Sequence, residues 1–165
     1  MSTDGKVASS PIRGGQVRLH SPDLADGGDL PNLPDGPGVY VLVCTFGGRS
    51  HHRLGEILYL GASNSLRRRV AYALATPGKS APHPVQGPLA ELQSKGGIAR
   101  VNFCRLDREV PEKTFETAMI VEYRRRTGRL PKWNTARPSK QAIPLEIRLA
   151  AATVLDQLNV REEPG

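Results

Sequence analysis

A glutamate inside an apolar helical stripe is the residue of this chain that most needs a chemical explanation. Apolar residues recur at helical spacing over residues 111–127, and Glu116 falls within their stripe while Glu122 falls at its margin. Burial of a carboxylate is unfavourable unless it is paired, hydrogen-bonded or bound to a metal ion. Glu116 is therefore a candidate metal ligand, or one half of a buried ion pair.

Three consecutive arginines on an earlier predicted helix offer phosphate-binding chemistry. In the helix expected over residues 64–74, Arg68 points away from the apolar seam, whereas Arg67 and Arg69 flank it. A guanidinium that leans over a sheet edge can hold a phosphate through two parallel hydrogen bonds. We therefore expect Arg67 or Arg69 to face a phosphate, and Arg68 to be solvated.

The positive charge of the chain lies in its second part. The sequence has 23 Lys and Arg against 16 Asp and Glu, a net charge of +7. Residues 1–64 hold five basic and six acidic side chains, whereas residues 65–165 hold eighteen and ten. Such a localised excess favours a polyanionic partner, and nucleic acid is the commonest of these.

Size and cysteine content exclude several classes of protein. A chain of 165 residues is long enough to bury a core, and two cysteines are too few for a disulfide framework or a four-thiolate zinc site. The longest apolar run, 39–44, has six residues, whereas a membrane span needs about 20. We expect a soluble, cytoplasmic protein with no membrane partner.

The elements that must position these residues follow from periodicity and from helix and strand stop signals. The pattern predicts strands over 39–46, 56–60 and 98–106 and helices over 64–74, 84–95, 111–127 and 143–158. This order predicts an α+β fold, ββααβα, with a small, mostly antiparallel three-stranded sheet flanked by helices, plus a C-terminal helix. Composition suggests a disordered or loosely draped arm over 1–34, a domain over 35–136, and a basic linker with an amphipathic helix over 137–165.

Two of the four tyrosines lie in short glycine motifs on the paired first strands, Gly38-Val39-Tyr40 and Tyr59-Leu60-Gly61. These motifs resemble the two tripeptides that give the GIY-YIG nuclease family its name. The resemblance extends to Arg69, eight residues after Gly61, to Glu116 on a later helix, and to Pro131-Lys132-Trp133-Asn134. It covers about residues 36–136, and the predicted ββααβα order agrees with it.

The resemblance implies a metal-dependent endonuclease that hydrolyses phosphodiester bonds in DNA, with one Mg²⁺ or Mn²⁺ held by Glu116. It implies that Arg69 stabilises charge on phosphorus and that Tyr40 or Tyr59 activates the attacking water. Asn134 would hold its loop in place or contact the phosphate. The basic side chains expected to contact nucleic acid are Arg67, Arg124, Arg125, Lys132 and Arg137.

The choice of metal ligand depends on the residues that come after each glutamate. Glu122 lies twelve residues before Asn134, the spacing familiar in the family, whereas Glu116 lies eighteen before it. Positions after Glu122 that should be apolar are instead Arg125 and Arg126. We therefore favour Glu116, with a longer connector before the asparagine.

The loop between the two tyrosine motifs departs from the family pattern, because nineteen positions separate Tyr40 from Tyr59 where about ten are usual. His51 and His52 in this loop, and His83 before the second helix, have no partners at metal-ligand spacing, so we expect exposed loop histidines.

Two further expectations concern partners. A non-catalytic nucleic-acid-binding or scaffold protein that keeps the fold is the alternative to a nuclease. The leucines of the C-terminal helix could pack on the core or mediate self-association; they are Leu145, Leu149, Leu155 and Leu158.

Overall fold

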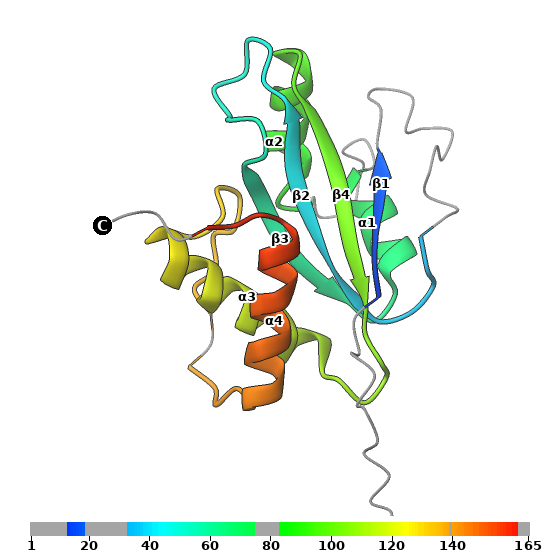
Figure 1. Cartoon of the computed structure of the whole chain (residues 1–165). Coiled ribbons are helices and arrows are strands. Elements are labelled where there is room, and N and C mark those ends of the chain that lie inside the picture. Colours follow the sequence, from blue (N-terminus) through cyan, green and yellow to red (C-terminus); the bar gives the residue numbers. More distant parts are fainter. Residues whose placement is uncertain (1–12, 19–32, 75–82, 139, 162–165) are drawn as a thin grey trace, which may run out of the picture.

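Four antiparallel strands form one sheet at the centre of the structure (Figure 1). The strands are β1 (Arg13–Arg18), β2 (Gly38–Phe46), β3 (Ile57–Ser63) and β4 (Ile98–Arg105), in the order β1-β4-β2-β3. The computed structural model describes residues 13–18, 33–74, 83–138 and 140–161, and of 13–18 it describes the backbone.

Helices cover both faces of this sheet (Figure 1). They are α1 (Leu66–Leu74), α2 (Gln86–Ser94), α3 (Glu112–Thr127) and α4 (Leu145–Gln157). Alternate residues of β2 point to opposite faces, so Tyr40 and Leu42 join the core beneath α1 and α2, whereas Val39 and Val41 join the core beneath α3 and α4. Because β2 is buried on both faces, its sequence is a nearly continuous run of apolar residues.

The α+β class and the antiparallel sheet are confirmed, and each predicted strand and helix is present within a few residues of its expected bounds. One difference is β3, which continues to Ser63 because Gly61, Ala62 and Ser63 pair with the start of β2. A glycine at this position suggests the end of a strand. In the sheet it instead lies opposite Tyr40, where a side chain has no room.

The sheet has a fourth strand that the composition of residues 1–34 does not predict. The backbone of Arg13–Arg18 pairs with β4 in register, from Arg13 opposite Arg105 to Arg18 opposite Arg100. The expectation of a disordered or draped arm is therefore wrong for this segment, and the three-stranded sheet becomes four-stranded. Residues 1–12 and 19–32 of the predicted arm lie outside the described residues.

The edge strand β3 is covered by the segment that carries the Pro-x-x-Asn motif. The Trp133 amide donates to the Leu58 carbonyl at 2.8 Å. The Asn134 amide nitrogen donates to the Leu60 carbonyl, and its oxygen accepts from the Leu60 N–H, both at 2.9 Å. The Leu58 carbonyl and the Leu60 N–H and carbonyl therefore have hydrogen-bond partners. An edge strand normally leaves such backbone groups open for pairing with another chain.

The C-terminal helix packs on α3 and shares its core, so residues 145–157 are part of the folded domain. Leu155 is fully buried and Leu158 packs against the same core, whereas Leu145 and Leu149 remain more than half exposed. Self-association through the two exposed leucines stays a prediction. Within the described ranges, no helix is long and apolar enough to cross a membrane.

Candidate active site

Tyr40 and Tyr59 lie on the same face of the sheet, diagonally opposed on β2 and β3. Tyr40 pairs with Gly61, and Tyr59 pairs with Leu42. The two ring centroids are 5.9 Å apart. A Cβ at Gly61 would lie 2.5 Å from Cζ of Tyr40, so only glycine lets the tyrosine ring cross the neighbouring strand. The glycine of the second motif therefore serves the tyrosine of the first.

The glycine of the first motif has an equally specific reason. A Cβ at Gly38 would collide with the Cys104 carbonyl of β4 and with the side chain of Leu66. Leu66 begins α1, and its amide donates to the Gly36 carbonyl at 3.0 Å. Gly38 thus allows α1 to lie close against the sheet, which brings the arginines of that helix to the tyrosines.

Arg69 of α1 reaches both phenols. Hydrogen bonding and positive charge from Arg69 act to lower the pKa of Tyr40 and of Tyr59. Burial acts in the opposite direction and is the larger effect, so both pKa values lie above that of a free phenol. Tyr40 is the more deeply placed of the two, 1% exposed against 9% for Tyr59.

Glu116 of α3 lines a pocket together with Tyr59. Its negative charge is a further cause of the raised pKa values of Tyr59 and Tyr40. The side chain is 20% exposed, and the Lys113 ammonium lies 3.3 Å from its Oε2. The buried apolar neighbours predicted for the helix are present, but the ion pair of Glu116 is with the exposed Lys113 and is not a buried pair.

Glu122 is engaged elsewhere. Arg125 holds it through two hydrogen bonds of 2.9 Å, and Arg126 adds a third at 2.8 Å. These bonds lower the pKa of Glu122 to about 2. Arg126 Nη1 also donates hydrogen bonds to Asp156 Oδ1 of α4 at 2.6 Å and to the Val160 carbonyl at 2.8 Å. Glu122 therefore belongs to the contact between α3 and α4, away from the tyrosines.

Asn134 is expected either to hold its loop or to contact phosphate, and the structure places it in the first role. Both ends of its amide bond the backbone of Leu60, one residue from Tyr59. This bidentate contact replaces a strand partner at the edge of β3. Asn134 therefore positions the loop beside Tyr59, and it is not placed as a free phosphate ligand.

His83 belongs to the tyrosine cluster, and the expectation of an exposed loop histidine is wrong for it. It is 3% exposed, its Nε2 lies 3.2 Å from Tyr40 Oη, and its ring lies 5.6 Å from that of Tyr59. Burial, and then the charge of Arg69, lower the pKa of His83 to about 4. Tyr40 lies 43 residues away along the chain and on another element, so no local pattern could identify this partner.

His52 also differs from the expectation, since it is 7% exposed and packs edge-on against Trp133 at 5.8 Å. The long loop between the tyrosine motifs therefore supports the segment that carries Asn134. His51, the third of these histidines, is exposed as expected.

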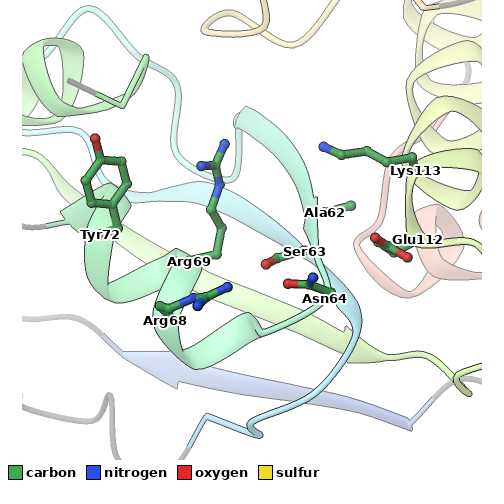
Figure 2. Close-up of a pocket in the computed structure, with 8 residues that line it drawn as sticks. All are labelled: Ala62, Ser63, Asn64, Arg68, Arg69, Tyr72, Glu112 and Lys113. Atoms are coloured by element: carbon green, nitrogen blue, oxygen red, sulfur yellow. The ribbon is translucent and has the colours of Figure 1, made fainter. Parts of the chain in front are cut away.

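The two arginines that precede Arg69 on α1 are both exposed. Arg67 Nε donates to the Leu33 carbonyl at 2.9 Å, so it ties the chain before β2 to α1. Arg68, expected to be merely solvated, lines an open pocket of about 520 Å³ together with Arg69. Figure 2 shows this pocket, with Arg69 extending into it from α1 and Lys113 from α3. Its other lining residues are Ala62, Ser63, Asn64, Tyr72 and Glu112.

A second pocket has a volume of about 330 Å³. Tyr59, Glu116 and Asn134 line it together with Arg137. Lys113 lines both this pocket and the basic pocket of Figure 2.

The other basic side chains predicted to contact nucleic acid differ in their exposure and in their ion pairs. Arg124 and Lys132 are exposed, and Arg137 is exposed at the rim of the second pocket. Arg125 is exposed but bound to Glu122. The cluster over 124–126 is therefore not uniform, because Arg126 is 9% exposed and joins two helices.

The residues present suit one kind of metal ion. In the described ranges, no group of three or more His, Cys, Asp and Glu side chains is placed to hold a metal. A single partly exposed carboxylate in an open pocket is the donor set of a Mg²⁺ site that keeps several waters and binds substrate oxygens. Glu116 fits that description, and Glu122 does not.

Comparisons of the chain with protein-family models, curated proteins and solved structures found no match.

Proposed function

We propose that this protein is a metal-dependent endonuclease of the GIY-YIG type that hydrolyses phosphodiester bonds in DNA. The observation that carries the proposal is the convergence of four side chains from four elements. The rings of Tyr40 of β2 and Tyr59 of β3 have centroids 5.9 Å apart, Glu116 of α3 lines a pocket with Tyr59, and the charge of Arg69 of α1 acts on both phenols. These four are also the residues that the motif spacing singles out.

Tyr59 is the better placed of the two tyrosines to accept the proton of an attacking water. It lines the pocket that Glu116 also lines, whereas Tyr40 is buried behind it. After releasing its own phenol proton to solvent, its Oη would take the proton from water while the water oxygen attacks phosphorus. The bond from phosphorus to the leaving oxygen then breaks, and solvent protonates the leaving group. Arg69 stabilises the phenolate and the added charge on the phosphoryl oxygens.

Glu116 would hold the divalent cation, which when bound supplies Lewis-acid stabilisation of charge on the leaving oxygen. The carboxylate needs no other protein ligand for this, since Mg²⁺ retains water and takes substrate oxygens. Lys113 would leave Glu116 and turn to the phosphates on binding, because its long side chain is 69% exposed and lines both pockets.

A nucleic-acid backbone is the substrate that the surrounding charge favours. Arg68 and Lys113 in one pocket and Arg137 in the other offer cations to backbone phosphates on both sides of the tyrosines. Contacts of this kind bind without reading sequence and give a strong salt dependence.

The test is cleavage of single-stranded, duplex and branched DNA with Mg²⁺ or Mn²⁺. Glu116→Ala and Arg69→Ala should each lower the rate by at least about 100-fold, because each removes several kcal/mol of transition-state stabilisation. Matched controls are Glu146→Ala and Arg148→Ala on the exposed surface of α4. Cleavage that survives both site substitutions would exclude this site.

One observation favours the alternative, a nucleic-acid-binding or scaffold protein without catalysis. The carboxylate of Glu116 already has a cationic partner in Lys113, so a metal must compete for it. That alternative predicts salt-dependent DNA binding with no cleavage by the wild type at any concentration of Mg²⁺ or Mn²⁺.

A further inference from the structure

The imidazole of His83 has a hydrogen-bond partner at each ring nitrogen. Nδ1 accepts from the Val85 backbone N–H at 3.3 Å, and Nε2 lies 3.2 Å from Tyr40 Oη. The residue is held further through its backbone, because its N–H donates to Gln86 Oε1 at 3.2 Å. Gln86 in turn donates from Nε2 to the Tyr72 carbonyl at 2.8 Å, which ties the start of α2 to α1.

These contacts determine which nitrogen carries the proton. A backbone N–H can only donate, so the nitrogen facing Val85 must be unprotonated. A neutral imidazole then carries its single proton on Nε2, and the bond to Tyr40 runs from His83 to the phenol oxygen. Oriented in this way, His83 has no lone pair at Nε2 with which to take a proton from Tyr40.

The direction of this bond extends to the second tyrosine. With its oxygen accepting from His83, Tyr40 has its own hydroxyl proton left to donate. The ring centroids of Tyr40 and Tyr59 are 5.9 Å apart, so the neighbouring phenol is the polar group that this proton can face. We expect Tyr59 Oη to be the acceptor that follows Val85 N–H, His83 and Tyr40.

We propose that His83 is a positioning residue that donates from Nε2 to Tyr40 Oη and thereby directs the Tyr40 hydroxyl proton toward Tyr59 Oη. Its effect on cleavage rests on the proposed function, whereas its tautomer and its hydrogen bond to Tyr40 do not. Local sequence patterns place His83 on the surface, and the nuclease motifs do not include it.

The surroundings of His83 support a neutral donor over a cation. Among the residues that the structure describes, the titratable and charged groups that face it are Tyr40 of β2, Tyr59 of β3, and Tyr72 and Arg69 of α1, and none of them is a carboxylate. From α2, Gln86 presents a neutral amide. Protonation would place a second cation near Arg69 and would break the bond from Val85, which agrees with a pKa of about 4.

Nuclear magnetic resonance tests the tautomer without reference to activity. In the full chain labelled with ¹⁵N, two-bond correlations should show His83 protonated at Nε2 and still neutral at pH 5.5, with a slowly exchanging Hε2 proton. That proton should be lost in Tyr40→Phe and kept in Tyr59→Phe. Protonation at Nδ1, titration near pH 6.5, or an Hε2 proton indifferent to Tyr40→Phe would overturn the proposal.

Activity provides the second test, through two substitutions that differ in one donor. His83→Gln supplies an amide N–H near the position of Nε2, whereas His83→Leu supplies none. We expect cleavage to slow by about 2- to 10-fold in His83→Leu, with its acidic limb moved to higher pH, because a hydrogen bond between two neutral groups is lost. His83→Gln should retain most of the rate and the wild-type pH profile.

Equal rates and profiles for the two variants, with both folded by thermal melting, would contradict the positioning role. If either variant fails to fold, the spectra of the wild type and Tyr40→Phe decide the matter. If neither the wild type nor any variant cleaves DNA, the proposed function fails, and the spectra still decide the hydrogen bond.

Discussion

Two glutamates of α3, Glu116 and Glu122, differ in the kind of cation that surrounds them. Glu116, in the first half of the helix, meets one exposed lysine at 3.3 Å and opens into a pocket beside Tyr59. Glu122, six residues later, is held by two arginines in three hydrogen bonds of 2.8–2.9 Å. The side chains of Glu116 and Glu122 are 20% and 19% exposed. Exposure therefore does not decide which carboxylate can bind a metal ion.

Whether each carboxylate can bind a metal ion depends on the cation with which it is paired. A lysine on a flexible stem gives a weak, exchangeable pair, and a metal ion can replace it. Planar guanidinium groups that themselves bond a second helix give a fixed pair. Glu116 is suited to chemistry, and Glu122 joins α3 to α4 through Arg126.

The largest expected effect comes from Glu116→Gln. Cleavage should fall by at least about 100-fold, because the substitution removes the carboxylate expected to hold the cation. The free energy of unfolding should change by no more than about 0.5 kcal/mol, since an exposed ion pair on a helix contributes little. Cleavage rates check the first expectation, and urea denaturation checks the second. A loss of unfolding free energy as large as the loss of activation free energy would show that Glu116 stabilises the fold.

Glu122→Gln should show the opposite pattern. It leaves Arg126, which is 9% exposed, without its carboxylate on α3, so we expect a loss of about 2–3 kcal/mol in the free energy of unfolding. The activity of the folded fraction should stay close to that of the wild type. Urea denaturation and rates corrected for the folded fraction measure this, and a folded enzyme that is about 100-fold slower would show that Glu122 is the metal ligand.

The same residue predicts a dependence of stability on pH. The pKa of Glu122 is lowered to about 2 in the folded state from 4.5, so its stabilisation is present above pH 4.5 and is lost as the pH falls toward 2. The difference in unfolding free energy between wild type and Glu122→Gln should therefore close over that interval. A gap that remains constant down to pH 2 would argue that the arginine bonds are not the cause.

A smaller pair of effects separates Arg67 from Arg68 on α1. Arg68→Ala should weaken DNA binding and lower the slope of log affinity against log salt by about 1, because it removes one phosphate contact. Arg67→Ala should leave that slope unchanged and cost about 1 kcal/mol of stability through the lost bond to Leu33. Binding measured at several salt concentrations distinguishes them, and equal slopes would refute the assignment.

The smallest effect concerns the ion pair of the first half of α3. Lys113→Met should tighten Mn²⁺ binding by about twofold, because a competing exposed pair of about 0.3–0.5 kcal/mol is removed. Paramagnetic titration of the protein without DNA measures this affinity. Lys95→Met, which breaks the exposed Lys95–Glu91 pair elsewhere, is the matched control and should leave the affinity unchanged.

Much of the site could be predicted because motif spacing and helical periodicity are local properties. The apolar stripe of α3 singles out Glu116, and the arginines after Glu122 argue against the latter without knowledge of any contact. Periodicity on α1 leaves Arg67 and Arg69 open as phosphate ligands and predicts a solvated Arg68, which is exposed. It cannot show that Arg67 bonds the carbonyl of Leu33, 34 residues earlier.

Sequence by itself determined the order of strands and helices from β2 onward, the two glycines that the tyrosine motifs require, and the localised positive charge, because each depends on neighbouring residues. Only the tertiary structure decided that Arg13–Arg18 pairs with β4, that Asn134 bonds the edge of β3, and that His83 joins Tyr40. Asn134 lies 74 residues from Leu60 and His83 43 from Tyr40. Over such separations the packing of whole elements selects the partner.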